Sequence, residues 1–152
     1  MSEESKELSS KEPEKIYPVW GNVVLLVLRL FVVFIVIPAG WNKIQGGVEG
    51  IEGFSVYVKN LGLPFPLVSA YAAVLTEFFA PMFYVIGFGA RIVSIPLIGT
   101  FIVATFVAHG KDVMELNWAE FYIPLGVLVS CCVIAWFGPG SFSVGGSADH
   151  ED

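Results

Sequence analysis

The fold is decided by residues 19 to 43, VWGNVVLLVLRLFVVFIVIPAGWNK. The first part of this stretch, residues 19 to 37, is an apolar run whose only ionisable side chain is Arg29. As a helix the run would measure about 27 Å at ~1.5 Å per residue, close to the ~30 Å hydrocarbon thickness of a bilayer. We therefore expect it to span a membrane, with Arg29 near the midplane.

The composition also predicts an integral membrane protein. Of the 152 residues, 55% are hydrophobic and only 14% are charged, whereas soluble domains are typically about 25% charged. The net charge of −6 comes mainly from the two tails, because eight of the fourteen acidic residues lie there. The sequence has no basic patch interleaved with aromatic residues, which excludes a nucleic-acid partner.

The rest of the chain supplies three more candidate spans. Apolar runs of the length that a bilayer requires cover residues 67–87, 92–109 and 121–137. The expected fold is therefore all-α, an integral membrane four-helix bundle over residues 16–143. Residues 1–15 are expected to form a polar tail and residues 144–152 an acidic tail, because both are nearly devoid of large apolar side chains.

A short amphipathic helix is expected between the first and second spans. Apolar residues recur there at spacings of three and four, namely Ile51, Phe54, Val58 and Leu61, which predicts a helix lying in the membrane interface. Four spans put both tails on one side. We expect that side to be the cytoplasmic face of the inner membrane, although lysine and arginine residues are almost evenly divided between the two sides.

Two opposite charges are expected to meet inside the bilayer. Glu77 is the only charge in the second span and lies ten residues from its start, so it matches the depth expected for Arg29. A charge near the midplane of the bilayer is unfavourable by at least ~2.5 kcal/mol unless it has a partner of opposite charge. We therefore predict a buried ion pair between Arg29 and Glu77, either as a clasp that fixes helix register or as part of a polar cavity for a head group or a proton.

A second polar group is expected on the side opposite the tails, where the topology gathers Trp41, Asn42, Lys43, His109 and Glu120. Histidine titrates near neutrality, and a neighbouring carboxylate can orient its ring or exchange a proton with it. A quinone needs hydrogen-bond donors and protons at its carbonyl oxygens, and apolar or aromatic walls around its ring. We therefore predict that these five residues bind a quinone or a similar ligand. The alternative is that His109 and Glu120 occupy helix ends only because the helix dipoles favour them there.

Other cofactor classes are not expected. Cys131 and Cys132 are adjacent within an apolar run, so they provide neither a disulfide framework nor a zinc-type spacing and are interpreted as packing residues. One histidine within a span cannot make a two-histidine haem site, and the chain contains no CxxCH. We predict no metal site and no covalently bound cofactor, which leaves a quinone as the candidate ligand.

The chain resembles the DoxX family of small four-span membrane proteins over about residues 26 to 143. The resemblance is carried by LRL around Arg29, AGWNK at 39–43, the glycine-rich stretch that leads into LGLPFP at 61–66, Glu77, GFGAR at 87–91, His109 with Gly110, Glu120, and GPG at 138–140 followed by Ser143. It implies a four-helix membrane bundle associated with quinone-linked redox complexes. The sequence departs from the family pattern at Ala39, where relatives often have histidine, and after Ser143, where an acidic residue is usual.

These observations predict an accessory membrane subunit of a quinone-linked redox complex that binds a quinone or a similar lipid-soluble ligand. Its partners would be the lipid bilayer and a larger membrane protein complex. We expect at most a non-catalytic or quinone-binding subunit of an oxidoreductase, because no site for an electron-carrying cofactor is visible in the sequence. Two alternatives are a purely structural or assembly subunit of a larger membrane complex and a small transporter that uses Arg29 and Glu77.

Overall fold

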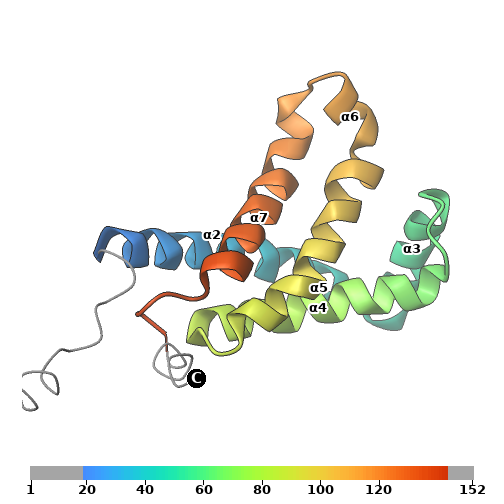
Figure 1. Ribbon diagram of the computed structural model, residues 1–152. Helices are drawn as coiled ribbons and strands as arrows, with labels where there is room; N and C mark the ends of the chain where they lie inside the picture. Colours follow the sequence, from blue (N-terminus) through green and yellow to red (C-terminus); the bar gives the residue numbers. More distant parts are fainter. Residues whose placement is uncertain (1–18, 144–152) are drawn as a thin grey trace, which may run out of the picture.

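The computed structural model describes residues 19–143, so the two predicted tails lie outside the described part of the chain. The described residues form helices and turns (Figure 1). In chain order the helices are α2 (Val19–Gln45), α3 (Gly47–Asn60), α4 (Pro66–Ile86), α5 (Ala90–Ile102), the π-helix η1 (Val103–Ala108), α6 (Gly110–Met114) and α7 (Trp118–Phe137). Within residues 19–143, four helical stretches are long and apolar enough to span a membrane: α2, α4, α5 continued by η1, and α7. The predicted all-α, four-span fold is confirmed.

The first span is longer than the apolar run that predicted it. Instead of ending near residue 37, α2 continues through Pro38 to Gln45. A proline inside a helix removes one backbone hydrogen bond, and membrane helices tolerate this loss where neighbouring helices pack against them. The extension matters for function because it places Lys43 in the last turn of α2, against the neighbouring helix.

The spans are arranged as two pairs. Figure 1 shows α2 and α4 running side by side, while α5 and α7 form a second pair that rises from them at a steep angle. The buried core lies where the pairs meet and combines Val32 and Val36 of α2, Tyr84 of α4, Leu97 of α5 and Ile134 of α7. The predicted amphipathic helix forms as α3, which packs against α4 and α2 and buries Val58 almost completely. Its placement in the membrane interface stays a prediction.

Gly40 allows α2 and α4 to approach each other closely. A Cβ atom added at Gly40 would lie 3.0 Å from the backbone carbon of Glu77 and 3.1 Å from the amide nitrogen of Phe78. Because these neighbours are backbone atoms, they cannot move aside without shifting α4 against α2.

We therefore expect Gly40→Ala to lower the free energy of unfolding by about 1–3 kcal/mol, the usual cost of overpacking. Unfolding by sodium dodecyl sulfate in mixed micelles, followed by circular dichroism, measures the change. The matched control is Gly53→Ala in α3, where an added Cβ would meet nothing within 4 Å. Equal stability of the two variants would show that the α2–α4 contact tolerates a wider separation.

Candidate ligand-binding site

Arg29 is buried, with 1% of its surface exposed, and its guanidinium group donates to backbone carbonyls. Nε donates to Tyr84 O at 2.8 Å and Nη2 to Val85 O at 3.0 Å. These carbonyls belong to the last turn of α4, where a helix leaves acceptors without partners and where its dipole favours a positive charge. Nη1 donates to Pro139 O at 3.1 Å and to Phe142 O at 3.0 Å. One side chain therefore joins α2 to the end of α4 and to the segment that follows α7.

The segment after α7 is attached to α2 at a second point. The side-chain oxygen of Asn22 accepts a hydrogen bond from the backbone N–H of Ser141 at 3.0 Å. Gly87, which ends α4 with a φ of 77°, leaves room for the guanidinium group of Arg29, because an added Cβ would lie 2.7 Å from Nη2. The segment that follows α7 is thus attached to α2 by hydrogen bonds between side chains of α2 and backbone groups of the segment.

Glu77 has a different partner from the one predicted. Its carboxylate is buried, with 5% of the residue exposed, and accepts hydrogen bonds from Lys43 Nζ at 2.8 Å to Oε1 and 2.6 Å to Oε2. The predicted ion pair between Arg29 and Glu77 is therefore corrected: within residues 19–143, Glu77 pairs with Lys43 and Arg29 binds carbonyls. The physical reason is the length of α2, because fourteen residues separate Arg29 from Lys43 and carry the helix ~21 Å further along its axis on nearly the same face.

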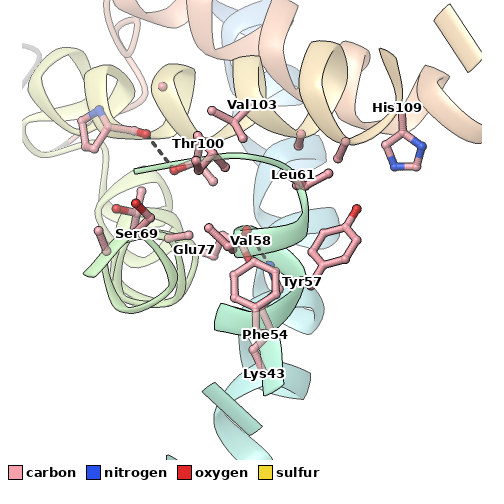
Figure 2. Close-up of a pocket in the computed structure, with 18 residues that line it drawn as sticks. Lys43, Phe54, Tyr57, Val58, Leu61, Ser69, Glu77, Thr100, Val103 and His109 are labelled. Atoms are coloured by element: carbon pink, nitrogen blue, oxygen red, sulfur yellow. Dashed lines mark hydrogen bonds and ion pairs between the residues drawn. The ribbon is translucent and has the colours of Figure 1, made fainter. Parts of the chain in front are cut away.

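A cavity of about 470 Å³ lies beside the Lys43–Glu77 ion pair. Figure 2 shows the side chains that line it, which come mainly from α3, α4 and α5 with η1. Small residues of α4 and α5, such as Ala72, Ala73 and Gly99, create the space, and Phe54 and Tyr57 of α3 supply aromatic walls. The volume falls within the range of about 300–1,000 Å³ that is typical of small-molecule sites.

Polar groups are placed at separate points of this cavity. Lys43 lies next to Phe54 of α3, with Nζ 4.4 Å from the ring centroid, so the ion pair contacts three helices. At another point, His109 lines the cavity while its Nδ1 lies 3.3 Å from Oδ2 of Asp112. The arrangement combines apolar walls with a few fixed polar groups, as ligand sites commonly do.

The structure brings together two of the five residues that were predicted to bind a ligand. Lys43 and His109 both line the cavity, whereas Trp41, Asn42 and Glu120 are exposed and lie outside its lining. Trp41 stacks on Phe78 instead, with ring centroids 6.3 Å apart. Residues two apart on a helix point to roughly opposite faces, which is why Lys43 reaches the cavity and Trp41 does not.

Several cavity residues were not predicted from the sequence. Among them are the hydroxyl residues Tyr57, Ser69, Thr76 and Thr100, together with Gly99. One signal was available, since Ala72, Thr76 and Ala80 recur every fourth position and small residues at that spacing mark a helix face against which another element can pack closely. The contribution of α5 to the cavity has no comparable signal in its sequence.

A four-span membrane protein with a mainly apolar cavity that carries a few fixed polar groups is the class that this fold and site define. The chain belongs to the DoxX family. The sequence pattern of that family matches residues 24–110, which include Arg29, Lys43, Glu77 and His109. The chain is 28% identical to the inner membrane protein YphA of Escherichia coli (strain K12) over 127 residues, 80% of this chain and 88% of that protein. It is also 28% identical to the inner membrane protein YqjF of the same strain over 126 residues, 81% and 90% of the two chains.

No solved structure matches the chain significantly. The candidate spans and these relatives identify it as a multi-pass protein of the inner membrane. The orientation of its tails stays a prediction.

Proposed function

We propose that this protein binds a quinone or a similar lipid-soluble ligand in the cavity between α3, α4 and α5, and that it does so as an accessory subunit of a quinone-linked redox complex in the inner membrane. The observation that carries the proposal is the cavity of about 470 Å³ with the partly buried Lys43–Glu77 ion pair in its wall. A mainly apolar hollow of this size, partly open at the protein surface and with fixed polar groups in its wall, is typical of small-molecule sites.

The chemistry of the lining supports a molecule with a flat apolar ring and polar oxygens. Phe54 and Tyr57 offer aromatic surfaces for a ring, while the Lys43–Glu77 pair and His109 offer polar contacts at its edge. Such a ligand reaches the protein through the bilayer, because its apolar part is more soluble there than in water. Electrons for a bound quinone would come from a partner protein, which is why we place the chain in a larger complex.

A structural or assembly subunit is the second candidate, and the contacts of Arg29 favour it. Four hydrogen bonds to carbonyls join three parts of the chain and require no ligand. We do not retain the transporter that would use Arg29 and Glu77 as a pair, because the two side chains have separate partners. Ligand content distinguishes the two remaining candidates.

Filling the cavity should remove the ligand without unfolding the protein. A Cβ added at Gly99 would meet nothing within 4 Å, so the leucine of Gly99→Leu can extend into the cavity that Gly99 lines. We expect at least about tenfold less co-purifying quinone, equivalent to ~1.4 kcal/mol or more of binding free energy. Extraction of the protein purified in mild detergent, followed by chromatography of the quinones, measures this content.

The matched control is Gly53→Leu, which adds the same side chain to open space at a helical position outside the cavity lining. It should keep the quinone content of the wild type. If both variants kept equal quinone, or if the wild-type protein carried none when purified from quinone-rich membranes, the structural subunit would become the better conclusion.

A further inference from the structure

The hydrogen-bond donors of the cavity are largely used within the protein. Lys43 has three N–H donors; Nζ lies within 2.8 Å of both oxygens of Glu77 and next to the face of the Phe54 ring. A carboxylate can accept about four hydrogen bonds, so Glu77 keeps acceptor capacity after binding Lys43. The charged end of the cavity therefore has more unused acceptors than donors.

The hydroxyl groups of Ser69 on α4 and Thr100 on α5 also use their protons within the protein. Thr100 Oγ1 donates to Pro96 O at 3.0 Å, and Ser69 Oγ donates to Pro64 O at 3.0 Å. Figure 2 shows the first of these bonds, with the oxygen of Thr100 at the cavity wall. A hydroxyl group that donates its single proton to a backbone carbonyl can only accept a hydrogen bond from a ligand.

His109 also presents an acceptor. Its Nδ1 lies 3.3 Å from the carboxylate oxygen Oδ2 of Asp112, and a carboxylate can only accept. Nδ1 therefore carries the proton in the neutral ring, which leaves Nε2 as an acceptor. Tyr57 and Thr76 have hydroxyls that can donate or accept, so they fit either kind of ligand and do not decide between them.

We infer that the cavity binds the hydroxyl-bearing, reduced form of its ligand, a lipid-soluble hydroquinone, in preference to the quinone. This inference rests on the proposed function. The two carbonyl oxygens of a quinone only accept, so they would face a lining whose open positions are mostly acceptors, and an acceptor that is buried without a donor is unfavourable. The two O–H groups of a hydroquinone can instead donate to Glu77, Thr100, Ser69 or the Nε2 of His109.

Three probes that share one apolar tail test the preference: decylbenzoquinone, decylhydroquinone kept reduced with dithionite under nitrogen, and the dimethyl ether of decylhydroquinone, which cannot donate. Isothermal titration calorimetry of the purified full-length protein in detergent at about pH 8 gives each dissociation constant. We expect the hydroquinone to bind at least about tenfold more tightly than the quinone and the ether, a difference that would raise the midpoint potential of the bound two-electron couple by about 30 mV.

One substitution tests whether a particular acceptor, the hydroxyl oxygen of Thr100, contributes to the preference for the hydroquinone. Thr100→Val keeps the shape of the side chain and removes its oxygen, so hydroquinone binding should weaken by about three- to tenfold while quinone binding stays the same. Ser55→Ala is the control, because Ser55 Oγ also donates to a backbone carbonyl, that of Glu52, but lies outside the cavity lining. Thermal melts of both variants verify that each is folded before titration.

The outcomes separate this inference from the proposed function. Tighter binding of the hydroquinone, reduced by Thr100→Val and unchanged by Ser55→Ala, supports both. Equal or tighter binding of the quinone, or equal binding of all three probes, overturns the preference and leaves the proposed ligand class standing. Failure of all three probes to bind overturns the proposed function as well.

Discussion

Arg29→Met should lower the free energy of unfolding by about 3–5 kcal/mol, because several carbonyls lose their shared donor and each unsatisfied buried acceptor costs about 1–3 kcal/mol. It should also reduce the amount of protein that inserts and accumulates. The variant leaves carbonyls of Tyr84, Val85, Pro139 and Phe142 without the donor that they share. Water cannot replace that donor inside a membrane protein as it does at a soluble surface. Unfolding by sodium dodecyl sulfate in mixed micelles measures the loss.

The conservative variant Arg29→Lys should fall between the wild type and Arg29→Met. An ammonium keeps the positive charge near the end of α4, but it lacks the planar five-donor fork that reaches four carbonyls from one position. Lys59→Met, which removes a charge from the exposed side of α3, is the control and should change stability by no more than about 0.5 kcal/mol. Wild-type stability of Arg29→Met would mean that the four hydrogen bonds do not hold the two segments.

Lys43→Met should be the second strongly destabilising change, because it leaves the carboxylate of Glu77 buried without its partner. Breaking a buried pair from one side typically costs about 3–5 kcal/mol. Adding Glu77→Gln removes the stranded charge, so the double variant should be more stable than the sum of the two single losses implies. A double-mutant cycle on unfolding free energies should give a coupling of about 1–3 kcal/mol between Lys43 and Glu77.

A second double-mutant cycle tests the ion pair between Arg29 and Glu77 that was predicted from the sequence. Arg29→Lys and Glu77→Gln should be additive within about 0.5 kcal/mol, since Arg29 and Glu77 share no hydrogen-bond partner. Strong coupling in this cycle together with none between Lys43 and Glu77 would contradict the geometry described above and restore the predicted pair.

The four spans could be predicted because each depends on local composition. Apolar runs near 20 residues have one stable arrangement in a bilayer, a helix that satisfies its own backbone hydrogen bonds. The amphipathic spacing of Ile51, Phe54 and Val58 likewise depends on one segment, and α3 forms over Gly47–Asn60. The end of the first helix was left open by the sequence, because the apolar run stops at Ile37 whereas the helix continues to Gln45.

The predicted ion pair between Arg29 and Glu77 was wrong because it depended on where the first span was centred. If the first span is taken as residues 19–37, Arg29 lies at its centre. Glu77, the charge at the centre of the second span, is then expected at the same depth as Arg29. In the structure α2 continues to Gln45, and Lys43 rather than Arg29 lies at the depth of Glu77. The common helical face of Arg29 and Lys43 was evident from their spacing of fourteen residues, but spacing alone did not show which of them meets Glu77.

By itself the sequence determined the class of the protein, its four spans and the amphipathic helix between the first two. It also showed that charged residues within the spans need partners inside the membrane. The tertiary structure decided which partner each buried charge has, and it created the cavity. The physical reason is that a cavity is a property of packing, because its walls come from α3, α4 and α5 with η1. Contacts within the protein also fix its polar side chains, including Lys43, Ser69 and Thr100. Hydrophobic periodicity sets the face that a helix buries, but the neighbours on that face depend on how the helices cross.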